Sequence, residues 1–296
     1  MSNFNNFSIV ASFVGLWINS FFNEKTQIVI GFVLIFTFGI LHGANDLKII
    51  EKSIDKDARF QFKKMLVFYS LAVFLGAILF YLLPILALIV FVLVSGYHFG
   101  EQHWFEYLIA KKSKFNKLFF LIYGLLILAL LFVFHSNEVE KIIYDIANIY
   151  ITSLFLNYFF YNILLVFIVL VLFVAFNNKQ FQKIIVRELF LLLVLAILFK
   201  TSSLIWGFAL YFILWHSIPS MKDQITYMYG KFSVENFLKY FKSAFLYWIT
   251  ALIGIFGLYF SLNKTHIFNA LFFSFLAAIT FPHVWVILRM FGSKKA

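Results

Sequence analysis

Long apolar windows recur along the whole chain and alternate with short polar stretches. An α-helix needs about 20 predominantly apolar residues to cross the hydrocarbon core of a bilayer. Ten windows come close to this length, at residues 7–22, 28–50, 64–82, 84–106, 117–135, 153–176, 184–200, 202–220, 240–262 and 267–291. The pattern predicts an all-α fold, a polytopic integral membrane bundle of about ten transmembrane helices. No polar block is long enough for a second domain, so we expect a single integral membrane domain over residues 1–296.

The composition strengthens this prediction and excludes several other classes. The chain is 63% hydrophobic and 12% charged, with a mean hydropathy of +0.94, and a soluble domain could not bury so much apolar surface. It has no cysteine, which excludes disulfides, thiolate metal sites and cysteine nucleophiles. The net charge of +11 does not indicate nucleic acid as a partner, because the basic residues lie in short loops between apolar windows.

The basic residues are distributed unequally between the two sides of the predicted bundle. Of the 24 Lys and Arg residues, all but four fall in alternate loops or in the C-terminal tail, and the four on the other side are Lys25, Lys141, Lys200 and Lys264. The positive-inside rule then places both termini in the cytoplasm, in a multi-pass protein of the cytoplasmic (inner) membrane. Residues 1–22 lack a basic n-region and a small-residue cleavage site, so they are expected to be a retained first helix.

Four of the seven histidines share one depth in the predicted bundle. They are His42, His98, His216 and His283, each six to eight residues before the charged cytoplasmic end of its helix. At about 1.5 Å rise per residue, each imidazole lies roughly 9–12 Å inside that end. A lone histidine in a helix bundle is usually a hydrogen-bonded packing residue, but four independent packing residues would have no reason to share a depth. We therefore expect a transition metal bound by neutral imidazoles, a ligand type that leaves iron, copper, nickel and zinc open.

Two carboxylates lie on the same helix faces as two of these histidines. Asp46 follows His42 by four residues and Glu101 follows His98 by three. A carboxylate that accepts the second imidazole N–H fixes the tautomer and raises the basicity of the ligand, although either residue could instead belong to the cytoplasmic surface. His103 is five residues after His98 and is turned off that face, so it is either interfacial or a further ligand.

The motifs together resemble those of the Brp/Blh family of membrane β-carotene 15,15′-dioxygenases. They are His42-Gly43-x-x-Asp46, His98-Phe99-Gly100-Glu101, His216-Ser217 and Pro282-His283, and they extend from the second window to the tenth. The resemblance implies cleavage of the central double bond of β-carotene with O2 to give two molecules of retinal, often for a bacterial rhodopsin. It also implies that Fe(2+) is held by His42, His98 and His216. With their neighbours Asp46 and Glu101, these three are the expected catalytic residues.

Two positions depart from the pattern of this family. The family usually has a second histidine four residues after the one matching His216, where this chain has Ser220, and commonly an acidic residue where it has His103. A serine hydroxyl is a poor iron ligand, which leaves His283, His103 or water for the fourth position. We predict His283, because it lies at the shared depth on a fourth helix. Pro219 leaves open whether the helix continues unbroken to Ser220.

Three other functions compete with carotenoid cleavage. Another metal-dependent oxidation of membrane lipids or carotenoids is one, but membrane desaturases and hydroxylases usually carry many histidine pairs at i,i+3 or i,i+4, and this chain has no such pair. A metal or proton transporter would need polar residues at several depths, whereas the outer halves of these windows are almost wholly apolar. A family member that has lost cleavage and only binds metal is the third. The partners expected for cleavage are a carotenoid entering from the lipid phase, O2 and membrane lipids.

Overall fold

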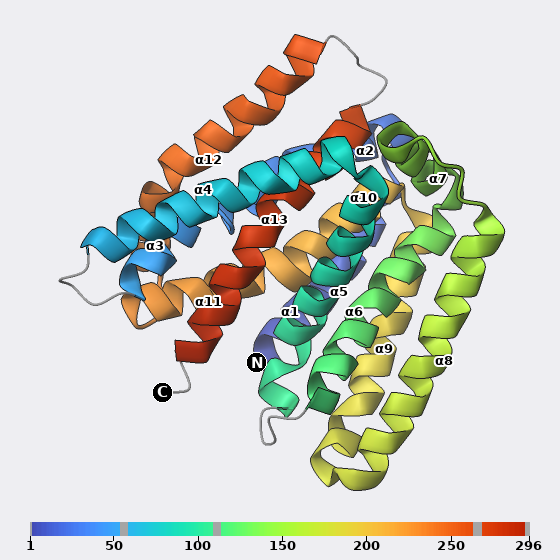
Figure 1. Cartoon of the computed structure of the whole chain (residues 1–296). Helices are drawn as coiled ribbons and strands as arrows, with labels where there is room; N and C mark the ends of the chain where they lie inside the picture. Colours follow the sequence, from blue (N-terminus) through green and yellow to red (C-terminus); the bar gives the residue numbers. More distant parts are fainter. Residues whose placement is uncertain (1, 54–58, 109–113, 263–267, 294–296) are drawn as a thin grey trace. The chain divides into compact units, whose positions relative to one another are not determined.

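The computed structural model describes residues 2–53, 59–108, 114–262 and 268–293, and all regular structure within them is helical (Figure 1). The predicted all-α fold is confirmed. The helices are α1 (Ser2–Asn19), α2 (Glu24–Leu34), the π-helix η1 (Ile35–Gly39), α3 (Asp46–Lys52), α4 (Arg59–Leu82), α5 (Pro84–Leu108), α6 (Lys114–Phe134), α7 (Ser136–Ala147), α8 (Ser153–Asn177), α9 (Lys179–Thr201), α10 (Leu204–Tyr211), the π-helix η2 (Phe212–Ser217), α11 (Ile218–Tyr229), α12 (Val234–Leu262) and α13 (Phe268–Ser293).

Seven stretches of described helix are long and apolar enough to cross a membrane, three fewer than the sequence windows suggested. They are Phe62–Leu82, Pro84–Phe105, Phe115–Phe134, Ser153–Phe176, Leu204–Tyr229, Val234–Gly257 and Ala270–Met290. Each overlaps one predicted window, so the disagreement concerns the windows at 7–22, 28–50 and 184–200.

Each of these three windows is helical, but each is absent from the seven spans for a different reason. In the described part of α1 the apolar helix is Asn6–Asn19, which is shorter than the seven spans. The window at 28–50 is divided, because α2 and η1 end before a turn at residues 42–45 and α3 begins after it. Helix α9 carries Arg187, Glu188 and Lys200 within its apolar part. Only continuous apolar helices qualify as spans, so the count of ten is not confirmed.

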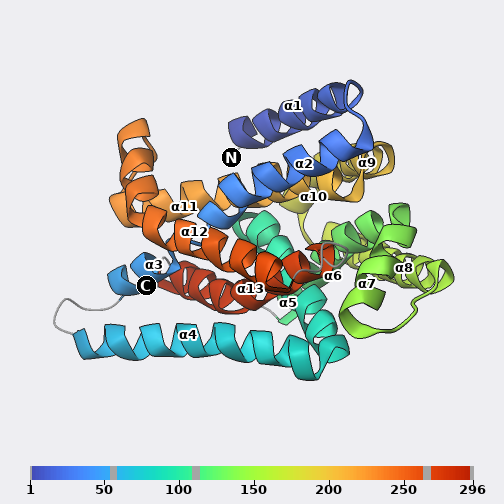
Figure 2. The ribbon, with the colours of Figure 1, turned by 90° about the horizontal axis from the view of Figure 1, so that it is seen from above.

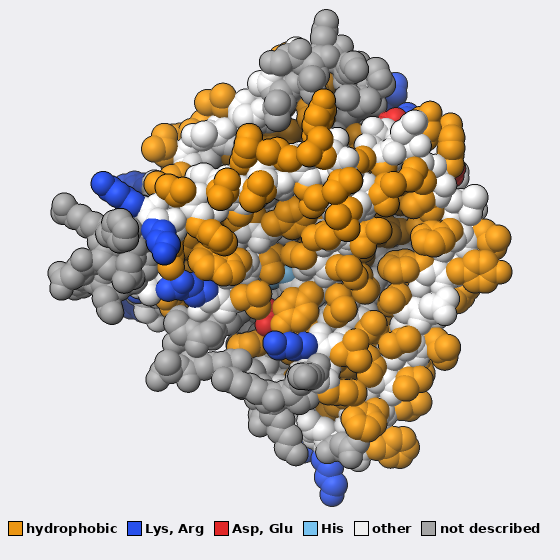
Figure 3. Space-filling model, in the orientation of Figure 1, with side chains coloured by type: hydrophobic (Ala, Val, Ile, Leu, Met, Phe, Trp, Pro, Cys, Tyr) orange, Lys and Arg blue, Asp and Glu red, His pale blue; other side chains and the backbone are white. Residues whose placement is uncertain are grey.

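The outer faces of several of these spans are apolar and exposed, as expected for helices that face lipid. Only 6% of the most apolar window of α4 and 17% of that of α8 are buried, and large hydrophobic side chains follow both helices. Hydrophobic side chains also cover much of the face drawn in Figure 3. Helices of this length with exposed apolar side chains need a bilayer around them, so the chain is a multi-pass membrane protein.

The helices form two compact units, which are described separately. The first unit comprises residues 1–35, 95–144 and 149–216. In it α6 packs against α8 and α9, while α10 packs against α2, α9 and α6. Ring contacts fill its core: Trp104 is fully buried, with the rings of Phe119 and Phe181 5.0 and 5.4 Å away.

Backbone contact between α5 and α6 sets the position of one candidate residue in the first unit. A Cβ atom added to Gly100 would lie 1.8 Å from the Phe120 carbonyl oxygen, and one added to Gly124 would lie 1.8 Å from the Gly96 carbonyl oxygen. Small residues permit this close approach of membrane helices. His98 lies between Gly96 and Gly100 on α5, so its place depends on this contact.

The second unit comprises residues 36–94, 145–148 and 217–296. Helix α13 lies along α4 and also packs against α3 and α12 (Figure 2). The start of α3 is tied to α12 through Asn45, whose Nδ2 donates to the Tyr240 carbonyl oxygen at 2.9 Å and whose Oδ1 accepts from Ser243 Oγ at 2.8 Å. The turn that follows His42 is therefore held by side-chain hydrogen bonds as well as by packing.

Candidate metal centre

The first unit contains a pair of buried histidines, His98 on α5 and His216 in η2. Their ring centroids are 4.8 Å apart, their planes cross at 79°, and the residues are 1% and 2% exposed. Gln102, one turn after His98, donates from Nε2 to the carbonyl oxygen of His216 at 3.0 Å. This hydrogen bond fastens the π-helical turn to α5 and so keeps the two imidazoles together.

Pro219 lies two residues after the π-helical turn that presents His216. Pro219 has no N–H, so the carbonyl of Trp215, four residues earlier, lacks its usual helical donor. The wider turn η2 lies directly before it, and π turns are frequent at functional sites. The chain continues as α11 from Ile218, so the helical path does not end at Pro219.

Aromatic rings surround His216 within the first unit. Phe212 stacks on its imidazole at 5.2 Å with planes 23° apart, and Phe208 stacks on Phe212 at 5.2 Å. Phe99, the residue after His98, meets the His216 ring edge-on at 4.8 Å. These rings place hydrocarbon rather than water beside the imidazole.

The second unit contains another buried pair, His42 and His283. Their ring centroids are also 4.8 Å apart, with planes at 89°. His42 Nδ1 is hydrogen-bonded to the carbonyl oxygen of Gly39, at the end of η1. A carbonyl oxygen can only accept, so Nδ1 carries the proton and the lone pair of a neutral ring lies on Nε2. That nitrogen is the one able to bind a metal.

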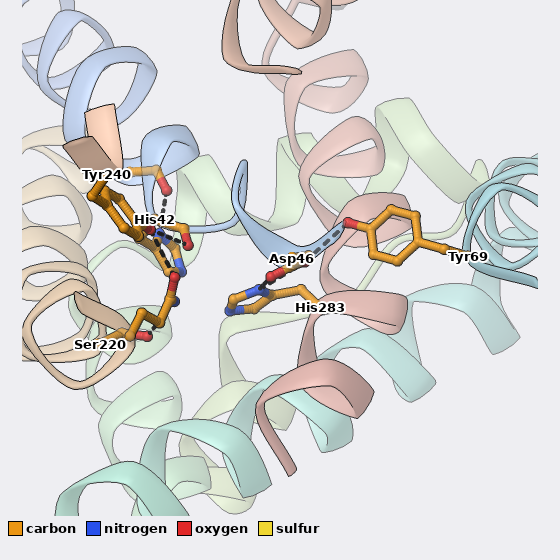
Figure 4. Close-up of polar contacts among 8 residues, drawn as sticks. His42, Asp46, Tyr69, Ser220, Tyr240 and His283 are labelled. Carbon is orange, nitrogen blue, oxygen red and sulfur yellow. Dashed lines mark hydrogen bonds and ion pairs between the residues drawn. The ribbon is translucent and has the colours of Figure 1, made fainter. Parts of the chain in front are cut away.

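His283 is held by a carboxylate rather than by a carbonyl. Its Nδ1 lies 2.8 and 3.0 Å from the two oxygens of Asp46, and Tyr69 donates to Asp46 Oδ2 at 2.9 Å (Figure 4). The sequence suggested that Asp46 would support His42, its neighbour on the same chain segment. Asp46 is instead hydrogen-bonded to a histidine 237 positions away, because the turn at residues 42–45 carries Asp46 off the helix that precedes His42.

Ser220 belongs to a second buried chain of hydrogen bonds in the same unit. Gln224 Nε2 donates to Ser220 Oγ at 3.0 Å, and the Tyr240 hydroxyl lies 2.7 Å from Gln224 Oε1 and 3.1 Å from the carbonyl oxygen of His42 (Figure 4). All four residues are buried. The serine hydroxyl is thus linked through two side chains to the backbone of a candidate ligand.

A sequence model of the family β-carotene 15,15′-dioxygenase matches residues 33–291, which include both histidine pairs. The chain belongs to this family. The resemblance noted from the motifs is confirmed, and the family points to carotene dioxygenation and to a metal cofactor. Comparison with curated proteins and with solved structures found no significant match.

The side chains of this β-carotene dioxygenase family member fit a metal ion. Each unit buries two imidazoles, and the hydrogen bonds of His42 and His283 leave Nε2 of both rings as the acceptor nitrogen. Imidazole without thiolate suits iron and the neighbouring metals copper, nickel and zinc. The donor set is therefore compatible with the iron that the family resemblance implies.

The two remaining predicted residues, Glu101 and His103, both belong to the first unit. Glu101 is buried and accepts a hydrogen bond from Tyr97 at 3.1 Å, so it does not lie on the cytoplasmic surface. His103 Nε2 lies 2.7 Å from Glu188, and its ring stacks on Tyr123 at 5.0 Å. Arg187 also binds Glu188, at 2.5 Å. His103 is thus part of an ion-pair network between α5 and α9, which favours His283 as the further ligand.

The sequence predicts two further histidines, His135 and His266, on the external side of the membrane. His135 lies between α6 and α7, and burial lowers the pKa of its imidazole. His266 lies outside the described residues. Sequence reasoning overlooked four supporting residues, namely Tyr69, Gln102, Gln224 and Tyr240. Each is a polar residue within or next to an apolar window. Such a residue is only a weak signal in the sequence, because its hydrogen-bond partner is known only from the structure.

Proposed function

We propose that this protein cleaves the central 15,15′ double bond of β-carotene with O2, giving two molecules of all-trans-retinal. One carbon–carbon double bond breaks, and the two atoms of O2 become the two aldehyde oxygens, so no further reductant is needed. The observation that carries the proposal is the burial of two histidine pairs in a chain that belongs to the dioxygenase family.

The proposed metal ligands are His42, His98, His216 and His283, the four histidines that share one depth in the bundle predicted from the sequence. Ferrous iron, when bound by them, would supply the electrons that make O2 reactive toward the polyene. The family resemblance implies the first three as ligands, and His283 is the proposed fourth. Glu101 is assigned with Asp46 to the catalytic region as a supporting carboxylate.

The other side chains around the histidines would orient the ligands and exclude water. The Gly39 carbonyl fixes the His42 ring, and Gln102 fixes the backbone of His216. The rings of Phe99 and Phe212 offer an apolar surface beside His216 that suits a hydrocarbon polyene. A dry site protects the reaction from side reactions with water.

The proposed substrate is confined to the bilayer, so it would enter laterally from lipid. O2 is the second substrate, and the product retinal would pass to a retinal-binding protein such as a rhodopsin. The distribution of basic residues predicts a protein of the cytoplasmic membrane with both termini in the cytoplasm.

Expression in a bacterium that accumulates β-carotene tests the function directly. The wild-type protein should bleach the cells while all-trans-retinal appears in extracts, and His98→Ala should do neither. His135→Ala is the matched control, a buried histidine outside the proposed site, and should behave as wild type. Equal loss of retinal in both variants, or no retinal with the wild type, would refute the proposal.

Ser220 favours one alternative, a family member that holds metal but has lost central cleavage. Its hydroxyl is engaged by Gln224, and a hydroxyl is a poor substitute for an imidazole ligand. If this alternative is correct, the wild type binds iron without producing retinal and Ser220→His restores cleavage. Retinal production by the wild type would exclude it, and a product other than retinal would indicate a different carotenoid oxidation.

A further inference from the structure

Three side chains of the second unit, the half-buried Tyr69 and the buried Asp46 and His283, form one continuous chain of hydrogen bonds (Figure 4). They come from three helices, α4, α3 and α13, and these helices pack against one another. The side chains of Asp46 and His283 are 2% and 7% exposed. Water therefore does not replace these hydrogen bonds easily.

The chemistry of the donors and acceptors determines the direction of the chain. A carboxylate oxygen can only accept, so the proton between Asp46 and His283 belongs to Nδ1 of the imidazole. Tyr69 donates its hydroxyl proton to Oδ2 of the same carboxylate at 2.9 Å. Two donors from different helices thus point at one carboxylate, and the lone pair of His283 is directed to Nε2.

The group that accepts a hydrogen bond from His42 and the group that accepts one from His283 differ in charge. His42 donates to the neutral carbonyl of Gly39, whereas His283 donates to the carboxylate of Asp46. A carboxylate on the far nitrogen makes an imidazole a more basic and more electron-rich ligand. In this pair the His283 ring is hydrogen-bonded to a carboxylate and the His42 ring to a backbone carbonyl.

We propose that Asp46 and Tyr69 are positioning residues for His283, which makes it the ligand that brings negative charge to the metal. Asp46 fixes the tautomer and orientation of the ring, and Tyr69 fixes Asp46. This inference rests on the proposed metal site and deepens it. It accounts for two polar residues that the resemblance alone does not place beside this histidine.

A purely structural ion pair between α3 and α13 is the competing explanation. It would lower stability when broken but would not affect the electron density at the metal. Asp46→Asn separates the two explanations, because asparagine keeps an oxygen acceptor for Nδ1 and removes the charge. Tyr69→Phe removes one hydrogen bond and leaves the carboxylate in place.

The experiment uses the purified full-length protein loaded with Fe(II), with affinity measured by chelator competition and the Fe(III)/Fe(II) midpoint potential by titration. Asp46→Asn should weaken iron binding roughly 10–100-fold, as expected for a residue behind a ligand, and should raise the potential. Tyr69→Phe should change both quantities in the same direction by a smaller factor. Tyr81→Phe, a tyrosine on the same helix that is 87% exposed, should match the wild type.

The outcomes separate failure of this inference from failure of the metal site. If the wild type binds no iron, the proposed site and this inference both fall. If His283→Ala loses iron while Asp46→Asn and Tyr69→Phe keep wild-type affinity and potential, the positioning role is refuted and the ligand assignment stands. If Asp46→Asn does not fold, Tyr69→Phe alone decides, because a wild-type potential in that variant contradicts the proposal.

Discussion

Replacing Gly124 by alanine tests whether backbone contact between α5 and α6 holds His98 in place. The new methyl carbon would lie 1.8 Å from the Gly96 carbonyl oxygen, and ordinary contact begins at 3.4 Å, so the two must separate by about 1.6 Å. Over-packing typically costs about 1–3 kcal/mol, and we expect roughly the upper value because the obstacle is backbone. His98 follows Gly96 by two residues and should move with it.

Unfolding by SDS titration, followed by circular dichroism, measures the stability of this variant, and bound iron is measured on the same samples. A misplacement of about 1 Å can lower a catalytic rate roughly 100-fold, so retinal production should fall even in folded protein. Gly254→Ala is the control, since a methyl group there meets no described atom within 4 Å. If Gly124→Ala unfolds like Gly254→Ala and keeps full iron, the reasoning about this contact is wrong.

Three further predictions concern the polar networks and the topology. Glu188→Gln should destabilise the protein by about 1.5–3 kcal/mol while iron stays bound, whereas Glu235→Gln, on the exposed surface, should have little effect in the same SDS titration. Tyr240→Phe should cost about 1–3 kcal/mol by leaving Gln224 without this donor, and unchanged stability would contradict the role of that chain. Reporter fusions after residues 57, 113 and 180 should be cytoplasmic and one after residue 143 external, and a cytoplasmic signal at 143 would refute the predicted topology.

The sequence by itself determined the fold class and the family. Apolar runs of about 20 residues have the length of a helix that spans a bilayer and satisfies its own backbone hydrogen bonds, so the all-α bundle followed from length and composition. The motifs around His42, His98 and His216 identified the family, and the family model matches residues 33–291. The count of ten spans is not confirmed where apolar windows contain charges or a turn, as in α9 and at residues 42–45, because a window average conceals them.

Only the tertiary structure decided which side chains meet within each unit. Asp46 was expected beside His42 because spacing along one helix was the only guide, yet the turn before α3 directs it to His283 and Tyr69. His103 could not be separated from the candidate ligands until α9 brought Glu188 to it. Helical periodicity predicts the face on which a residue lies, whereas the partner across the interface depends on crossing angle and close backbone approach, which no local pattern in the sequence encodes.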